Sequence, residues 1–188
     1  ISAHWKGLYN AYKALIIADG KNHKDFFKNI SEFKKWWTPD WRRNLECLKI
    51  DDEEKAHKIF YEVSNSHIHI FDWVGPIIGE LYPKHWLALL TNRHKKNAEE
   101  LLCSLAIFFH PIVGGDNVKN LKPDPEGINL ILAKLGVKRE EALMIGDTAV
   151  DITAGKAAGV KTGAVRWGLG SWEELISLKP DYLFKKGN

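Results

Sequence analysis

The first part of the chain, up to about residue 81, repeats apolar residues at helical spacing. Trp5, Leu8, Tyr12 and Leu15 lie three or four positions apart, so they fall on one face of a helix. The pattern breaks at the polar segments ADGKN, TPD and KIDDEE, and the acidic residues of the last segment are typical of a helix start. The pattern therefore predicts a bundle of about four helices and no strand.

After Pro83 the pattern changes, because short apolar runs now alternate with helical segments. The runs of strand length are HWLALLTN, FFHPIVGGD, EALMIGD, VKTGAVRW and DYLF. The helical segments between them are HKKNAEELLCSL, PEGINLILAKLG, AVDITAGKAAG and SWEELISL, and Gly136 and Gly159 stand at the usual capping position of two of these helices. Such alternation is typical of βαβ units in a parallel sheet. The sequence thus predicts an α/β protein with a helical region over residues 1–80 and a parallel sheet within residues 81–188.

Composition and charge exclude several classes of function. The chain of 188 residues is 45% hydrophobic and 27% charged, which is ordinary for a globular protein, and its net charge of +3 is too small for a nucleic-acid-binding surface. No apolar run approaches the roughly 18 residues of a membrane helix, and no signal segment is present. Cys47 and Cys103 are too far apart for a zinc or disulfide motif. We expect a soluble, cytoplasmic protein that binds neither nucleic acid nor membranes.

Polar residues follow the predicted strands at the point where each strand ends. Thr91 and Asn92 end the first strand, Asp116 follows the second, Asp147 ends the third, and Trp167 follows the fourth. In an open parallel sheet, ligands bind beyond the carboxyl ends of the strands. We therefore expect these side chains to converge at one edge of the sheet.

Asp147 and Asp151 form a pair with helical spacing at the end of the third predicted strand. Such spacing allows both carboxylates to face one point, and Mg²⁺ takes one or two carboxylates with water and substrate phosphate as its other ligands. The alternative is structural: Asp147 caps the following helix and Asp151 complements its dipole. The pair alone does not decide between these interpretations.

Lys122 lies in the segment NLKPDPEG, just before a predicted helix. Pro123 favours an extended Lys122, Asp124 is a natural N-cap and Pro125 suits the first helical position. A lysine held there can neutralise a phosphate or an acyl-phosphate. The alternative is a solvated loop lysine. Thr91 and Asn92 are open to two interpretations in the same way, because they can bind phosphate or form a turn.

Taken together and in this order, these segments resemble the haloacid dehalogenase-like hydrolase superfamily, and within it the phosphoglycolate phosphatase-like branch. The resemblance covers about residues 84–188. LALLTNR is similar to the second family motif, LKPDPEGINLILAKLGV to the third, ALMIGDTAVDITAGKAAGVKTGAVRWG to the fourth, and WGLGSWEELISLKPDYLF to the usual ending of the branch. The resemblance implies a three-layer, Rossmann-like core over residues 81–188. It also makes residues 1–80 similar to the helical cap that the family inserts between its first and second motifs.

The resemblance further implies Mg²⁺-dependent phosphoryl transfer from a small phosphorylated metabolite, such as a phosphoglycolate-like monoester. In the family, an aspartate on the first strand attacks phosphorus, a second aspartate two residues on acts as acid and base, and water hydrolyses the aspartyl-phosphate. By motif position, the catalytic residues would be Thr91 and Lys122. Thr91 and the backbone at Asn92 would hold the phosphoryl oxygens, and Lys122 would pair with nucleophile and phosphate. Asp147 would bind Mg²⁺, and Asp151 would ligate it or orient its waters.

The first family motif, an apolar strand ending in DxDGT or a close variant, is missing from this sequence. Asp19 in ALIIADGK has Lys21 rather than an acid two residues on, and Asp72 in IFDWV fails in the same way, so we expect a helix-ending turn and a hinge residue there. The missing strand belongs in the middle of the family's sheet, and without it the neighbouring strands would lack a partner beside an apolar slot. We therefore expect the nucleophile to lie upstream of Ile1.

Several interpretations remain open at this stage. The first is a Mg²⁺-dependent phosphatase, the second a catalytically inactive member of the fold that binds a phosphorylated ligand or a protein partner, and the third a phosphomutase. Dehalogenases are disfavoured, because that branch lacks the metal aspartate that Asp147 suggests. Trp167 and Gly168 either shape the loop beside the metal or pack in the core, and the aromatic residues of KKWWTPDW either line a substrate rim or pack between helices. The oligomeric state is left open.

Overall fold

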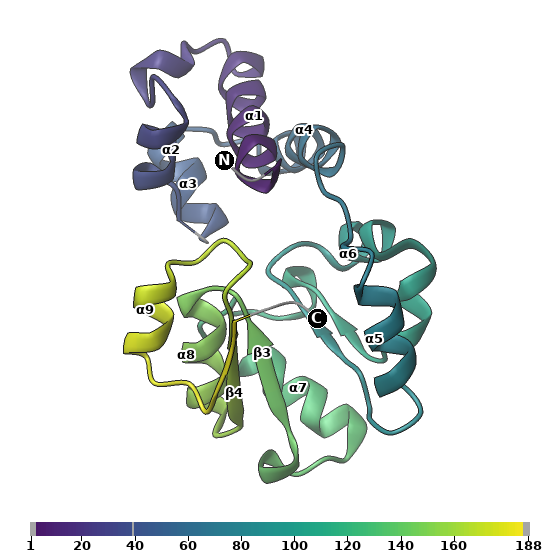
Figure 1. The fold of residues 1–188 in the computed structure, drawn as a ribbon. Helices are drawn as coiled ribbons and strands as arrows, with labels where there is room; N and C mark the ends of the chain where they lie inside the picture. Colours follow the sequence, from purple (N-terminus) through teal and green to yellow (C-terminus); the bar gives the residue numbers. More distant parts are fainter. Residues whose placement is uncertain (1–2, 39, 186–188) are drawn as a thin grey trace. The chain divides into compact units, whose positions relative to one another are not determined.

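The computed structural model describes residues 3–38 and 40–185 and divides the chain into two compact units, Ile1–His69 and Ile70–Asn188 (Figure 1). The division lies before the boundary at residue 80 that the sequence predicts. The reason is that helix α5 (Val74–Leu81) belongs with the second unit, where Tyr82 at its end meets Phe108 edge-on with ring centroids 5.1 Å apart.

The described residues of the first unit form helices and the turns that connect them, with no strand among them, as predicted. Its elements are α1 (Ala3–Ala18), η1 (His23–Asp25), α2 (Ile30–Trp36), α3 (Trp41–Leu48) and α4 (Glu53–Asn65). The side chains of Asn29, Asp40 and Asp52 accept hydrogen bonds from backbone N–H groups in the first turns of α2, α3 and α4. These caps satisfy donors that a helix start otherwise leaves unpaired, which explains why the helices begin where they do.

Aromatic side chains form the core of the first unit. Phe27 and Phe33 are buried, with ring centroids 5.0 Å apart, and Tyr12 packs beside Phe33 at 5.5 Å. Two tryptophans of the segment KKWWTPDW join this packing: Trp36 meets Tyr12 edge-on at 5.5 Å, and Trp41 meets Phe60 at 5.0 Å. Of the two interpretations of that segment, packing between helices is the one that the ring contacts support.

The second unit is an α/β structure with parallel strands. After α5 its elements are β1 (Leu89–Leu90), α6 (Lys95–Leu102), η2 (Cys103–Phe108), β2 (Ile112–Val113), η3 (Gly115–Asn117), α7 (Glu126–Leu135), η4 (Arg139–Glu141), β3 (Leu143–Gly146), α8 (Ala149–Ala158), β4 (Lys161–Val165), α9 (Trp172–Ser177) and β5 (Tyr182–Phe184). Every run predicted as a strand contains one, although the strands are shorter than the apolar runs. Helices α7 and α8 end at Gly136 and Gly159, both with positive φ, as predicted.

The described strands form two sheets, with the order β1-β2 in one and β3-β4-β5 in the other, and all pairings are parallel. Helix α8 packs on β3 and β4, where Ile152, Ala164 and Leu175 form a fully buried cluster. Strands β1 and β3 are each the edge of a sheet, and Leu143 and Ile145 of β3 are 43% and 51% exposed. Two unpaired edges and an exposed apolar strand agree with the expectation that a central strand is missing.

Within the stretches described, no helix combines the length and the apolar character needed to cross a membrane.

Candidate active site

Lys122 links the end of β1 to the start of α8. Its Nζ atom donates to the backbone carbonyl of Leu90 at 3.1 Å and to Asp151 Oδ1 at 2.7 Å. The two charged side chains are only 11% and 7% exposed. The structure therefore brings together two segments that the sequence singled out separately, and Lys122 is not a solvated loop lysine.

The Asn92 side chain holds the backbone of Lys122 from both sides. Asn92 Oδ1 accepts the N–H of Lys122 at 3.0 Å, and Asn92 Nδ2 donates to the carbonyl oxygen of Lys122 at 3.1 Å. A two-point clamp of this kind fixes both the position and the orientation of the peptide unit. The sequence indicated a role only for the backbone at Asn92, because no local pattern shows a contact between positions 30 residues apart.

Thr91 directly follows β1, where its N–H donates to the carbonyl of Val113 at 3.0 Å. Its Oγ1 accepts the N–H of Arg93 at 3.2 Å, which is a local turn contact. The hydroxyl therefore lies at the strand end, one residue from the carbonyl that Lys122 contacts. It can still donate its proton to a phosphoryl oxygen, since a hydroxyl donates and accepts at the same time.

Glu126 fixes the loop before Lys122 by accepting the backbone N–H groups of Lys119 and Asn120, both at 2.9 Å. These two hydrogen bonds hold the pKa of the Glu126 carboxyl below its usual value. Helix α7 begins at Glu126, one residue later than expected, with Pro125 at the N-cap position. Asp124 still caps this helix, because its Oδ1 accepts the N–H of Glu126 at 2.9 Å.

Asp151 is buried, and both of its carboxylate oxygens are engaged. Oδ1 pairs with Lys122, while Oδ2 accepts the hydroxyl of Thr148 at 2.7 Å, the N–H of Thr148 at 3.0 Å and the N–H of Asp147 at 3.2 Å. Burial raises the pKa of Asp151, but the charge of Lys122 and the hydrogen bonds from Lys122 and Thr148 outweigh it, so the pKa lies below its usual value. Asp151 is thus an ionised anchor for Lys122 and for the start of α8.

Asp147 lies between the end of β3 and the loop that follows β4. Its Oδ2 accepts the N–H of Leu169 at 2.8 Å, and its backbone oxygen accepts the N–H of Gly170 at 2.9 Å. A Cβ atom at Gly168 would overlap the Asp147 side chain, and one at Gly146 would overlap that of Asp151. Glycine is required at both positions because the backbone approaches the carboxylates so closely.

The two aspartates are therefore not equivalent as possible metal ligands. Asp147 carries a carboxylate, a hard ligand that suits Mg²⁺, and Asp151 directs both of its oxygens to Lys122, Thr148 and the backbone. Nowhere among the described residues do three or more His, Cys, Asp or Glu side chains gather in a metal-binding group. One carboxylate fits an ion that keeps several water ligands, and the hydrogen bonds of Asp151 fit the second role expected for it, which is orientation.

Asp116, the remaining acidic residue at a strand end, has a structural role. Its Oδ1 accepts the N–H of Lys95 at 2.7 Å and so caps the start of α6. Asp116 therefore serves the start of α6.

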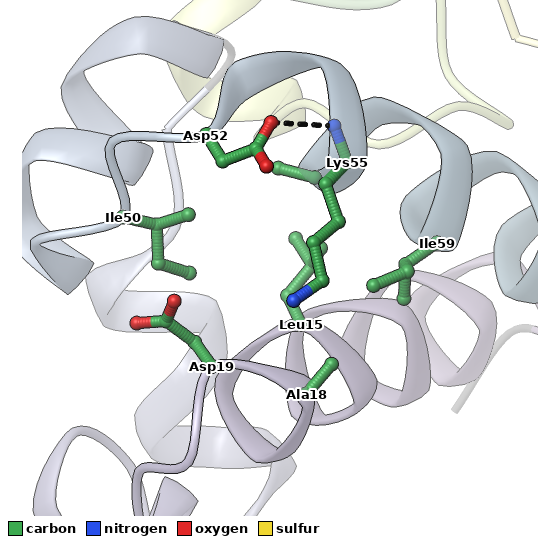
Figure 2. A pocket seen from close by; sticks show the side chains of 8 residues that line it. Leu15, Ala18, Asp19, Ile50, Asp52, Lys55 and Ile59 are labelled. Atoms are coloured by element: carbon green, nitrogen blue, oxygen red, sulfur yellow. Dashed lines mark hydrogen bonds between the residues drawn. The ribbon is translucent and has the colours of Figure 1, made fainter.

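The first unit contains a small pocket, which is not a candidate for substrate binding. It lies between α1 and the segment that leads into α4, and it is lined by Leu15, Ala18, Asp19, Ile50, Asp52, Lys55, Ala56 and Ile59 (Figure 2). Its volume of about 40 Å³ holds a few water molecules rather than a substrate. Asp19, a look-alike of the missing nucleophile, borders this pocket and forms an ion pair with Lys21, so it closes a helix-ending turn as expected.

Comparisons with known proteins agree with this arrangement. A family model described as haloacid dehalogenase-like hydrolase matches residues 20–165. The pyrophosphatase PpaX of Bacillus velezensis is 42% identical over 146 residues, which are 76% of this chain and 68% of the relative. The pyrophosphatase PpaX of Anoxybacillus flavithermus is 43% identical over 155 residues, which are 79% of this chain and 72% of the relative. The match to PpaX of Listeria welshimeri covers 36% of that protein.

Solved structures resemble the chain over nearly its whole length. A structure from Bacteroides fragilis described as a haloacid dehalogenase-like hydrolase has a TM-score of 0.80 at 20% identity and covers 98% of this chain and 91% of its own. A structure from Thermotoga maritima described as a β-phosphoglucomutase has a TM-score of 0.71 at 25% identity. The match covers 95% of this chain and 86% of that protein's chain. The expected fold and the expected enzyme class, a phosphoric ester hydrolase, are confirmed by these relatives. The chain belongs to the haloacid dehalogenase-like hydrolase family.

Proposed function

We propose that this protein is a Mg²⁺-dependent phosphatase that acts on a small phosphorylated molecule. The observation that carries the proposal is the environment of Lys122, whose ammonium group is held between the Leu90 carbonyl and Asp151 beside the Asp147 loop. A buried cation fixed at the carboxyl ends of parallel strands is suited to neutralise a phosphoryl group.

Each residue of the group has a separate task in this proposal. Lys122 attracts the phosphoryl group and stabilises the charge that develops on it during transfer. The Thr91 hydroxyl and the backbone N–H groups at Thr91 and Asn92 orient the phosphoryl oxygens. The Asn92 side chain and Asp151 are positioning residues, since they hold the backbone and the ammonium group of Lys122.

Asp147 is the residue that we assign to Mg²⁺, and Asp151 holds the backbone of Asp147 by a hydrogen bond. Asp151 accepts the N–H of Asp147, and the N–H of Leu169 holds the Asp147 carboxylate from the other side. When bound, Mg²⁺ would neutralise phosphate charge and orient the substrate. Of the two roles that the sequence allowed for Asp151, we propose orientation, which its hydrogen bonds to Lys122, Thr148 and Asp147 support.

The attacking aspartate is expected on an extended segment that pairs with β1 and β3. Both strands offer an unpaired edge, and Lys122 reaches from the end of β1 toward Asp151 at the start of α8. A strand placed between these edges would carry its last side chains toward Lys122 and Asp147. Family resemblance supplies the chemistry of the step: the aspartate forms an aspartyl-phosphate, which water then hydrolyses.

The substrate is proposed from two separate sources. The relatives that share 42% and 43% identity are named pyrophosphatases, so inorganic pyrophosphate is the first compound to test. The sequence resemblance favours a phosphoglycolate-like monoester, which is the second. A cytoplasmic location stays a prediction, with which the two cysteines, both unpaired and exposed, are compatible.

The test is an assay of phosphate release by the natural polypeptide, whose intact mass is measured first. We expect release from one of these two compounds to require Mg²⁺. Lys122→Ala and Asp147→Asn should each lower kcat by about 10²–10³-fold, as loss of an electrostatic stabiliser of the transition state typically does. Lys134→Ala is the matched control, because Lys134 is an exposed lysine on α7, the helix that follows Lys122.

Other outcomes would contradict the proposal in distinguishable ways. Wild-type rates in both variants would remove Lys122 and Asp147 from the site. Binding of inorganic phosphate with Mg²⁺ but no turnover, for a polypeptide whose mass equals that of this chain, would favour the inactive binding protein. Transfer of phosphate within a sugar phosphate, without release, would identify a phosphomutase.

A further inference from the structure

The loop that follows β4, residues 166–170, holds Asp147 at two points. The N–H of Leu169 donates to the Asp147 carboxylate at 2.8 Å, and the N–H of Gly170 donates to the Asp147 backbone oxygen at 2.9 Å. A side chain at Gly168 would overlap that of Asp147, so this loop lies directly against the carboxylate. The orientation of Asp147 therefore depends on where the loop lies.

Trp167 in this loop contacts an aromatic side chain from the start of α5. The ring of Trp73 meets Trp167 edge-on, with centroids 5.5 Å apart and an interplanar angle of 88°, and Phe71 stacks on Trp73 at 5.3 Å and 11°. Both aromatic residues belong to the segment that follows His69, where the second unit begins. The contact thus joins the entry segment of the second unit to the loop that holds Asp147.

We propose that Trp73 is a positioning residue for Asp147. Trp73 acts through Trp167, because the edge-to-face contact keeps the loop of residues 166–170 closed on the Asp147 carboxylate. A displacement of the segment that contains Trp73 therefore changes the geometry at Asp147. The inference rests on the proposed function only where it treats Asp147 as a metal ligand; the link between Trp73 and the loop does not depend on it.

The first experiment measures amide hydrogen exchange by NMR in Trp73→Ala, without Mg²⁺. Edge-to-face pairs contribute about 0.5–1.5 kcal/mol, so we expect exchange at Leu169 and Gly170 to accelerate severalfold, up to about tenfold. Exchange at Leu132, which lies in the core beside α7 and α8, should stay unchanged. Trp73→Phe retains a ring that can meet Trp167 edge-on, so this variant should restore most of the protection.

The second readout is the Mg²⁺ concentration that gives half-maximal hydrolysis. It should rise in Trp73→Ala by a factor similar to the change in exchange, while kcat at saturating Mg²⁺ stays within about twofold of wild type. Trp86→Ala is the matched control, because Trp86 is 72% exposed. It should change neither readout.

Two results would overturn the inference. Unchanged exchange at Leu169 in Trp73→Ala would show that the ring contact does not hold the loop, and equal acceleration throughout the second unit would show a general packing role. Trp73→Leu keeps an apolar side chain but removes the ring. The same measurements are made on this variant if Trp73→Ala does not fold. Failure of the proposed function is distinguishable, because hydrolysis would then be absent while the exchange result still stands.

Discussion

The pair formed by Lys122 and Asp151 is the most constrained feature of the site at the scale of single residues. Each charge is nearly buried, and each has further partners: the Leu90 carbonyl for the ammonium group, and Thr148 for the carboxylate. Removing one member of a buried pair leaves the other charge unpaired, which costs much more than the pair itself contributes. The pair therefore locks the position of the ammonium group.

This gives a prediction that separates Asp151 from Asp147. Asp151→Ala should lower the free energy of unfolding by about 3–5 kcal/mol, since it leaves the ammonium group of Lys122 buried without its partner. Asp147→Ala should cost clearly less, because the buried ammonium group of Lys122 keeps Asp151 as its partner in that variant. Urea unfolding of both variants, followed by fluorescence, measures the difference. Equal losses of stability would contradict the assignment of Asp151 as the anchor.

At the scale of elements, a second carboxylate fixes the connection between β4 and β5. Asp181, just before β5, accepts the N–H of Thr162 at 2.7 Å and the Thr162 hydroxyl at 2.9 Å, both with Oδ2, and Thr162 is fully buried in β4. The backbone hydrogen bond and then the hydroxyl bond hold the pKa of Asp181 below its usual value. An ionised side chain thus ties the residue before β5 to β4.

The sign of the resulting pH dependence follows from this lowered pKa. A carboxyl whose pKa is lower in the folded than in the unfolded chain contributes stability that is complete above its unfolded pKa of about 3.9, and that is lost as the pH falls through the lowered value. In Asp181→Asn we expect a lower urea midpoint at neutral pH and a smaller further decrease on acidification. Glu140→Gln, on an exposed residue of η4, is the control. Parallel pH profiles for wild type and Asp181→Asn would contradict the prediction.

At the scale of the whole molecule, the stability of the second unit depends on whether a further strand pairs with the edges of β1 and β3. An apolar side chain that is 51% exposed, as Ile145 is, should tolerate truncation within about 0.5 kcal/mol. A strand pairing with β3 would instead cover this residue. Truncation would then cost about 2–5 kcal/mol, as it does for a buried isoleucine.

We therefore predict that Ile145→Ala in the natural polypeptide destabilises the protein far more than Ile107→Ala. Ile107 is 76% exposed and lies in η2 rather than in a strand, so it serves as the matched control. Urea unfolding of both variants provides the comparison. Similar small effects of both substitutions would mean that the edge of β3 stays uncovered.

The sequence by itself determined the periodic features of this protein. Helical spacing in the first unit, alternation of strands and helices in the second, helix ends at Gly136 and Gly159, and polar residues at the strand ends all follow from preferences that act over a few residues. The five candidate site residues could be proposed for the same reason: parallel strands end at one edge, and family motifs are contiguous segments. Local preferences do not show where the first unit ends, since the division after His69 depends on long-range contacts such as that of Tyr82 with Phe108.

Tertiary structure alone decided which groups meet. The hydrogen bonds between Asn92 and Lys122, the ion pair of Lys122 with Asp151, and the contact of Trp73 with Trp167 join residues 29 to 94 positions apart. Hydrogen bonds and ring contacts at such separations depend on how helices pack against sheets, and no local preference encodes that packing. The sequence thus specified the chemical groups at the site, whereas the fold specified their partners.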